Sequence, residues 1–214
     1  MTRKYWLFHL LLIVAVLVAT AVAYPHLPSR VATHWDINLK PNGHSPKWAL
    51  FLLGPGLMSV IMLFTWLGPW LSPRHFEVDN FGSTFRQITM MAQTMMAYVN
   101  IVILWSGLGH RIDTGRVLMG GICLIAALMG NVMGKVRRNF FVGVRTPWTL
   151  ASERVWYATH RFAAKTFLAG GLLGLVLVCV GLRRWPVLAL LAGALAPVVY
   201  SLVLYKRLER HGEL

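Results

Sequence analysis

Residues 130–161 read GNVMGKVRRNFFVGVRTPWTLASERVWYATHR, and this stretch separates two long apolar segments of the chain. It holds six of the 21 Lys and Arg residues, together with two tryptophans and one histidine. A linker that only joined two helices would not need so many specific side chains. We therefore predict that the stretch is a folded unit and not a slack connection.

The apolar residues on either side of this stretch come in long runs. The chain is 57% hydrophobic and only 13% charged, and a run of about 18 or more apolar residues can cross a bilayer as a helix. Transmembrane β-strands would alternate and be about half as long. The sequence therefore predicts an all-α fold, a polytopic integral membrane bundle of six transmembrane helices. The six segments are Trp6–Tyr24, Trp48–Leu71, Ile88–Leu108, Val117–Met133, Ala163–Leu182 and Trp185–Tyr205.

The first apolar run resembles a cleavable signal peptide, since it follows a basic start and ends in Ala21-Val22-Ala23. A signal core is usually about 7–15 residues long, and this run is longer, at about 18 residues. We therefore interpret it as a retained first span.

The net charge of +14 would suit a nucleic-acid-binding protein, but the basic residues lie beside the predicted spans. With the N-terminus in the cytoplasm, 14 of the 21 Lys and Arg residues fall inside and 7 outside. This bias predicts that both termini and the motif loop 134–163 are cytoplasmic. Basic residues near the inner leaflet attract anionic lipids, so we expect membrane lipids, and no direct nucleic acid, as partners.

An exterior loop, residues 25–47, follows the first span. Residues 31–37 alternate in the pattern of a half-buried strand, and Pro41-Asn42-Gly43 predicts a turn because Asn and Gly tolerate positive φ. A short extended segment or hairpin over the outer face is expected. The connection 72–86, between the second and third spans, is expected to be a solvated loop of mixed charge.

His34, Asp36 and His44 in the exterior loop raise the question of a metal site. Zinc needs three or four converging ligands, and the spacing here is not diagnostic. The alternative is a polar rim anchored at the membrane interface by Trp35. We expect no metal and no cofactor.

Polar and small residues inside the spans predict how the helices pack. Thr89, Gln93 and Asn100 recur on one face of the third span and are read as interhelical hydrogen-bonding residues, with a substrate or ion path as the alternative. Gly54-Pro55-Gly56 predicts a kinked or locally opened helix. Close helix packing is expected at three sets of glycines, namely Gly130 with Gly134, Gly170 with Gly174, and Gly120-Gly121.

Within residues 130–161, Arg145-Thr146-Pro147-Trp148-Thr149 predicts a turn leading into a helix, because Pro suits a first helical position and Thr caps exposed N–H groups. The residues from Trp148 onward predict an interfacial amphipathic helix before the fifth span. An interfacial helix with Trp anchors explains the charge. It does not explain the spacing of Asn131, Asn139, Gly143 and Arg145.

These residues resemble the core of the SdpI family. The run from Asn131 through Asn139, Gly143, Arg145-Thr146-Pro147-Trp148-Thr149-Leu150, Trp156 and Thr159-His160 to Gly170 carries the resemblance. The exterior loop resembles the small uncharacterised domain that often precedes that core, through Pro28, Thr33-His34-Trp35, Asn38, Gly43 and Lys47. Arg138 departs from the family, which commonly has Pro there. An N-terminal membrane domain, 1–110, and an SdpI-like core, 111–214, are expected.

The family is typified by a bacterial membrane protein that gives immunity to a secreted toxic peptide and, when occupied, holds a transcriptional repressor at the membrane. The resemblance therefore implies a peptide partner outside and a repressor partner inside the bacterial plasma membrane. The residues that it marks for partner binding are Asn131, Asn139, Gly143, Arg145, Thr146, Pro147, Trp148, Thr149, Glu153, Trp156, Thr159 and His160, with His34, Trp35, Asp36 and Gly43 in the exterior loop.

Two other classes of function stay open on sequence alone. One is a small-molecule transporter or membrane enzyme, although the chain has no His-Glu-x-x-His, nucleophile or phosphate-loop motif, so we expect no enzyme. The other is an architectural bundle in which the motif loop is a structural plug. Packing of Arg145 and Trp148 inside the bundle would favour the plug, and an open cleft beside them would favour a binding site.

Overall fold

A computed structural model describes residues 3–71 and 82–214 of the chain. Six helices in this part are long and apolar enough to cross a membrane, which confirms the predicted helical membrane fold. The predicted loop between the second and third spans lies mostly outside the described residues. The spans are Arg3–His26, Ala49–Gly68, Gly82–Gly107, Thr114–Met133, Glu153–Cys179 and Trp185–Arg210.

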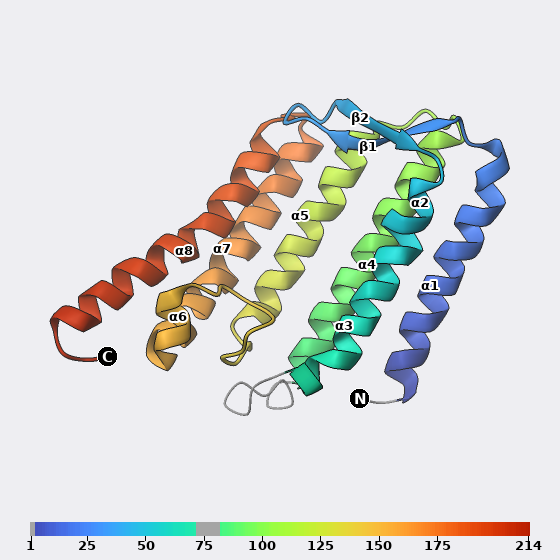
Figure 1. Cartoon of the computed structure of the whole chain (residues 1–214). Helices are drawn as coiled ribbons and strands as arrows, with labels where there is room; N and C mark the ends of the chain where they lie inside the picture. The colour runs from blue at the N-terminus through green and yellow to red at the C-terminus, as the bar shows by residue number, and fades with distance from the viewer. Residues whose placement is uncertain (1–2, 72–81) are drawn as a thin grey trace.

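The helices form two groups that are covered at one end by a β-hairpin (Figure 1). One group contains α1 (Arg3–Ala23), α3 (Leu57–Leu71) and α4 (Gly82–Gly107); the other contains α5 (Thr114–Met133), α7 (Glu153–Cys179) and α8 (Trp185–Arg210). Helix α7 packs between α5 and α8, and α4 contacts α5. The start of α1 and the end of α8 lie at the end of the bundle opposite the hairpin (Figure 1).

The second span is a continuous helix with a π-helical segment inside it. The short α2 (Ala49–Phe51) leads into η2 (Leu52–Gly56), which leads into α3. Pro55 lies inside η2 and has no N–H to donate, and the wider π turn accommodates that loss. The locally opened helix that Gly54-Pro55-Gly56 predicts is confirmed.

The polar face of α4 is used in contacts between helices. The Thr89 hydroxyl lies 2.6 Å from the Tyr5 hydroxyl of α1, and Gln93 Nε2 donates to the Met58 carbonyl at 2.8 Å. Asn100 donates to the Leu50 carbonyl at 3.1 Å and accepts from Thr20 at 3.1 Å. These bonds confirm the interhelical role predicted for the three residues.

Several of the predicted glycines lie where backbones meet. Gly130 faces the Ala164 carbonyl and the Leu168 backbone, and Gly170 faces the Ala189 carbonyl of α8. Gly174 lies against the Cys123 side chain. Gly134 and Gly120 have more room, since an added Cβ would meet only one atom at 3.8 Å and 4.0 Å respectively.

The region before the fifth span contains one short helix, α6 (Pro147–Ala151), and α7 then begins at Glu153. The amphipathic residues 153–162 are therefore the first turns of the spanning helix itself, which starts earlier than the predicted Ala163. Ser152 separates the two helices because its backbone is extended, with φ −133°. Its hydroxyl accepts from the Val155 N–H and caps α7.

The exterior loop forms an antiparallel hairpin of β1 (Arg30–Trp35) and β2 (Pro41–Pro46), after the 3₁₀ turn η1 (Tyr24–His26). The predicted turn at Pro41-Asn42-Gly43 is wrong, because these residues begin β2. The chain reverses at residues 36–40 instead. There Asp36 Oδ1 accepts from the backbone N–H groups of Asn38 at 2.8 Å and Lys40 at 2.9 Å, an arrangement that makes Asp a turn former.

Leu39 explains why the reversal occurs at residues 36–40. It has φ 60° although it is not glycine, and its side chain is buried. It lies against Gly115 at the start of α5, where an added Cβ would overlap the Leu39 carbonyl. Burial of the leucine side chain therefore offsets the strain of its backbone.

Candidate functional site

Two features of the fold contain most of the residues that the sequence marks. The first is the connector, residues 134–152 between α5 and α7, which lies at the end of the bundle where the chain termini are (Figure 1). The second is a pocket beneath the hairpin at the opposite end.

Asn139 organises the first half of the connector. It is fully buried. Its Nδ2 donates to the carbonyls of Arg137 at 2.7 Å and Val142 at 3.0 Å. Its Oδ1 accepts from the N–H groups of Phe141 and Val142, each at 2.7 Å. One amide side chain thus supplies both donors and acceptors to a loop that has no regular secondary structure.

His160 of α7 holds the second half of the connector. The Val144 N–H donates to Nε2 at 3.0 Å, so the ring proton lies on Nδ1 and is donated to the Trp156 carbonyl at 2.8 Å. Gly143 has φ +113°, and an added Cβ would overlap Nε2. The close approach of the loop to His160 therefore requires glycine at position 143.

Trp156 completes this contact. Its ring stacks on His160 with centroids 4.1 Å apart, and its indole N–H donates to the Val136 carbonyl at 2.8 Å. Trp156 also belongs to a buried cluster that includes Phe85 and Ile88 of α4 and Val132 of α5. The connector is thereby fixed to both helix groups.

Thr146 and Thr149 form the capping box of α6, as the predicted cap requires. Thr149 Oγ1 also donates to the Val144 carbonyl at 2.8 Å. Thr146 Oγ1 lies 3.1 Å from the hydroxyl of Ser201 in α8. No local sequence pattern marks Val136 or Ser201, because their contacts span 20 and 55 positions respectively.

The remaining motif residues do not join this buried network. Asn131 lies exposed on α5, and Pro147 and Glu153 are also exposed. Arg145 is exposed too, and its guanidinium donates to the Phe140 carbonyl. Glu153 pairs with Arg138 at 3.5 Å. Trp148 is half-buried, and Thr159 is buried with no hydrogen-bond partner for its hydroxyl among the described residues.

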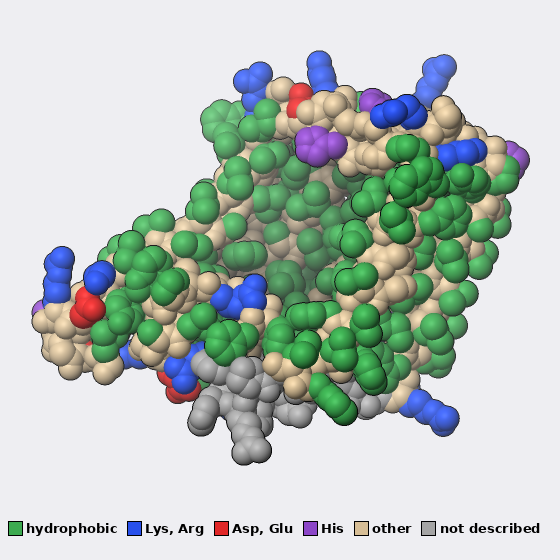
Figure 2. Space-filling model, in the orientation of Figure 1, with side chains coloured by type: hydrophobic (Ala, Val, Ile, Leu, Met, Phe, Trp, Pro, Cys, Tyr) green, Lys and Arg blue, Asp and Glu red, His purple; other side chains and the backbone are tan. Residues whose placement is uncertain are grey.

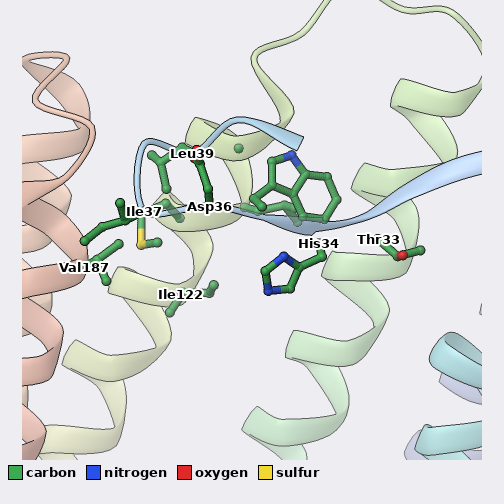
Figure 3. A pocket seen from close by; sticks show the side chains of 11 residues that line it. Thr33, His34, Asp36, Ile37, Leu39, Ile122 and Val187 are labelled. Carbon is green, nitrogen blue, oxygen red and sulfur yellow. The ribbon is translucent and has the colours of Figure 1, made fainter. Parts of the chain in front are cut away.

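The pocket beneath the hairpin, which we call the hairpin pocket, has a volume of about 400 Å³ and mostly apolar walls. The hairpin covers it, and α5 and α8 form its side (Figure 3). The space-filling view shows a hollow with many hydrophobic side chains below the hairpin (Figure 2). The lining residues are Thr33, His34, Trp35, Asp36, Ile37, Leu39, Gly115, Leu118, Met119, Ile122 and Val187.

His34 is the polar side chain that points from β1 into this space (Figure 3). Its Nδ1 lies 2.5 Å from Asn42 Oδ1. Gly43 lies opposite His34 in the hairpin, where an added Cβ would come within 2.9 Å of the His34 Cβ. Among residues 3–71 and 82–214, no group of three His, Cys, Asp or Glu side chains could hold a metal ion.

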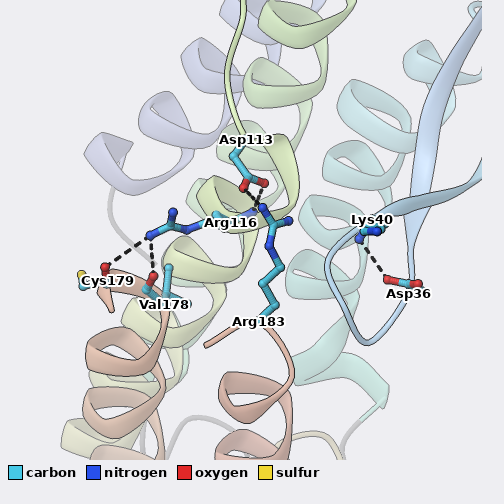
Figure 4. Close-up of polar contacts among 7 residues, drawn as sticks. All are labelled: Asp36, Lys40, Asp113, Arg116, Val178, Cys179 and Arg183. Carbon is cyan, nitrogen blue, oxygen red and sulfur yellow. Dashed lines mark hydrogen bonds and ion pairs between the residues drawn. The ribbon is translucent and has the colours of Figure 1, made fainter. Parts of the chain in front are cut away.

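Polar contacts fasten the hairpin to the second helix group. Arg184 Nε, at the start of α8, donates to Asn38 Oδ1 at 2.6 Å. Nearby, Arg183 pairs with Asp113 at 2.7 Å, and Arg116 donates to the carbonyls of Val178 and Cys179 at the end of α7 (Figure 4). The hairpin, α5, α7 and α8 therefore meet at one end of the bundle.

The turn that bears Asn38 depends on the ionised Asp36 carboxylate. The N–H group of Lys40 is the largest influence that holds the pKa of Asp36 below its ordinary value of 3.8 (Figure 4). A group with a lowered pKa stabilises the folded state above its ordinary pKa and loses that contribution as pH falls through the lowered value. The Asp36 carboxylate therefore makes its full contribution to the stability of the turn at neutral pH.

We predict that the hairpin loosens only as the pH falls below about 4, and that Asp36→Asn removes this transition. Tryptophan fluorescence measured against pH reports the change around Trp35. Subtracting the signal of a Trp35→Phe variant isolates the contribution of Trp35. An identical acid transition with and without the carboxylate would show that Asp36 does not control the turn.

The chain is similar to two protein families and to a known protein. Residues 135–205 match the family model of the SdpI/YfhL protein family, and residues 11–58 match that of a domain of unknown function, DUF1648. The chain is 25% identical over 156 residues to the immunity protein SdpI of Bacillus subtilis strain 168, which covers 73% of this chain and 72% of that protein. No solved structure matches the chain.

Each matched region overlaps one of the two sites. The DUF1648 match extends through the hairpin, and the SdpI/YfhL match contains the connector with α7 and most of α8. The chain is therefore an SdpI-like, multi-pass bacterial membrane protein in which a region that matches DUF1648 precedes a region that matches the SdpI/YfhL family.

Proposed function

We propose that this protein gives its cell immunity to a secreted antimicrobial peptide, or senses such a peptide, and that the peptide binds in the hairpin pocket. The similarity to an immunity protein over 73% of the chain is the observation that carries the proposal. The pocket supports it because apolar walls, with a few polar groups such as His34 and Asp36, are typical of ligand sites.

A route for a signal follows from the contacts of the hairpin. Asn38 bonds to Arg184, and Leu39 packs on Gly115, so a ligand that moved the hairpin would act on α5 and α8. Helix α7 runs without a break for 27 residues, about 40 Å. The Val178 and Cys179 carbonyls that Arg116 contacts lie about 28 Å along this helix from His160. Differential binding of a peptide to two positions of these helices would change the connector.

The output surface that we propose is the exposed basic side of the connector and of the first turns of α7. Its charged residues are Lys135, Arg137, Arg145, Arg154 and Arg161, all of which are exposed. A transcriptional repressor with an acidic surface would be attracted there. The same charges attract anionic lipids of the inner leaflet, which keep the surface close to the membrane.

The architectural alternative is supported by a different observation. Asn139, Trp156 and His160 bond to each other or to the loop backbone, and Gly143 lies against His160, as a structural plug requires. A transport path along α4 has less support, since Thr89, Gln93 and Asn100 bond to neighbouring helices. We therefore treat the buried motif residues as the frame of the connector and the exposed ones as its binding residues.

A survival assay tests the proposed function. Ile122→Trp fills the hairpin pocket and should abolish protection of sensitive cells against SdpI-type toxic peptides, whereas Leu128→Trp, on an exposed part of α5 away from the pocket, should leave it intact. Equal membrane levels of the two variants must be shown. Full protection by the Ile122 variant would exclude this pocket, and no protection by the unaltered protein would exclude immunity.

The proposed orientation puts both termini and the connector in the cytoplasm. In a Cys123→Ser, Cys179→Ser background, we predict that His44→Cys reacts with a membrane-impermeant maleimide in intact cells, and that Arg145→Cys reacts only after the membrane is opened. The opposite labelling pattern would place the connector outside and remove the proposed repressor contact.

A further inference from the structure

Two buried polar groups in the first helix group have no hydrogen-bond partner among the described residues. Both ring nitrogens of His9, in α1, are unbonded, and so is Oε1 of Gln93, in α4. His9 is 1% exposed and Gln93 is 0% exposed. An unbonded polar group is costly inside a membrane, where no bulk water can bond to it. An ionisable residue within a span marks a functional site by default.

The helical register places the two groups at the same depth. The hydroxyls of Tyr5 and Thr89 meet at 2.6 Å and join α1 to α4, and the two helices run in the same direction (Figure 1). His9 and Gln93 each follow that pair by four residues, about one helical turn. Both residues therefore lie one layer beyond the Tyr5–Thr89 contact.

The next helical layer, on the side of His9 and Gln93 away from Tyr5 and Thr89, is apolar. Ile13 and Val16 of α1 pack there with Met58 and Ala97. Gln93 Nε2 donates one N–H to the Met58 carbonyl at 2.8 Å, which orients the amide and leaves Oε1 without a partner among the described residues. The neighbours of the His9 ring are aromatic, with Tyr5 at 4.3 Å and Phe8 at 5.6 Å between centroids.

The two unbonded groups are chemically complementary. A neutral imidazole has one N–H donor and one acceptor nitrogen, and an amide oxygen is an acceptor. They are not within hydrogen-bonding distance of each other. A water molecule satisfies such groups by accepting from one and donating to the other, as buried waters in proteins do.

We propose that His9 and Gln93 form a binding site for one water molecule inside the membrane-spanning part of the protein. The water accepts the imidazole N–H of His9 and donates to Gln93 Oε1. It links α1 to α4 between the direct Tyr5–Thr89 and Thr20–Asn100 bonds. This site is independent of the hairpin pocket and of peptide binding.

Magnetic resonance on the full chain in lipid nanodiscs tests the site. With ¹⁵N-labelled histidine, the His9 ring N–H should show magnetisation transfer from a long-lived water, and the near-isosteric Gln93→Met change should abolish that transfer. His26, which is exposed, is the control and should contact bulk water in both proteins. Absence of a water contact at His9 in the unaltered chain would overturn the proposal, as would its persistence in Gln93→Met.

A thermodynamic cycle gives a second readout. His9→Phe and Gln93→Met should each lower the thermal unfolding midpoint by about 2–4 °C, because each leaves the other group and the water with a missing partner. The double variant should be no less stable than either single variant. Additive losses, or a higher midpoint in His9→Phe alone, would show that the two residues share no water.

Discussion

Alanine at Gly143 will destabilise the protein by about 2–6 kcal/mol, and the effect will be concentrated in the connector. Two causes add. The backbone of Gly143 has φ +113°, which costs a residue with a side chain about 1–3 kcal/mol. The new Cβ also overlaps His160 Nε2, so that ring must move and the part-buried Val144 N–H loses its acceptor, at about 1–3 kcal/mol.

The chain contains a matched control for this change. Gly109 also has positive φ, +89°, but an added Cβ would meet nothing within 4 Å. Gly109→Ala therefore carries only the backbone strain and should cost about 1–3 kcal/mol. Chemical unfolding of both variants in the same detergent measures the difference. Equal losses at the two glycines would mean that the contact with His160 contributes nothing to stability.

Gly171→Ala is expected to have the second largest effect, by separating α5 from α7. The added Cβ would lie 2.5 Å from the Ala127 nitrogen and 2.6 Å from the Cys123 carbonyl oxygen. Both atoms are backbone atoms of a helix, so the helices themselves must shift. Overpacking of this kind costs about 1–3 kcal/mol, and close backbone approach is a main source of stability between membrane helices.

Gly120→Ala in α5 is the control for Gly171→Ala. Its Cβ would meet only Val178 Cγ1, at 4.0 Å, and alanine favours a helix over glycine by up to about 1 kcal/mol. The two substitutions should thus have opposite signs in a thermal unfolding experiment. A stabilised Gly171→Ala protein would show that α5 and α7 are not closely packed at this layer.

The sequence was sufficient for the membrane architecture because each span is a local property. Length and hydropathy define the six helices one at a time, and the Gly-Pro-Gly run predicts the opened helix without reference to its neighbours. The polar residues of α4 were also interpretable, since a polar group at that depth must bond to another helix. The actual partners of these residues, such as the Met58 carbonyl, were not predictable.

The features that were predicted wrongly or not at all depend on residues that are distant in the chain. Pro41-Asn42-Gly43 carries the local signal of a turn, but Leu39 is buried against α5 and moves the reversal to residues 36–40. The fifth helix begins at Glu153 because Ser152 caps it, in a stretch where the apolar run has not yet begun. Local patterns do not contain this information.

The motif was found from the sequence, but the interactions that explain its spacing were not. The resemblance marked Asn139, Gly143 and His160 together, and the structure gives the spacing a reason: the loop is tied to itself by Asn139 and to α7 by His160. It also separates residues that the sequence grouped. Asn131 and Arg145 are exposed and lie outside the buried network.

The central claim is that the connector between α5 and α7 is a folded unit fixed by Asn139 and His160. Amide hydrogen exchange of the full chain in nanodiscs tests it most directly, at the N–H groups of Phe141, Val142 and Val144, which donate to those two side chains. We predict exchange at least about 100-fold slower than in an unstructured peptide, with Val144 losing this protection in His160→Ala. Exchange of all three amides at the rate of an unstructured peptide would contradict the account.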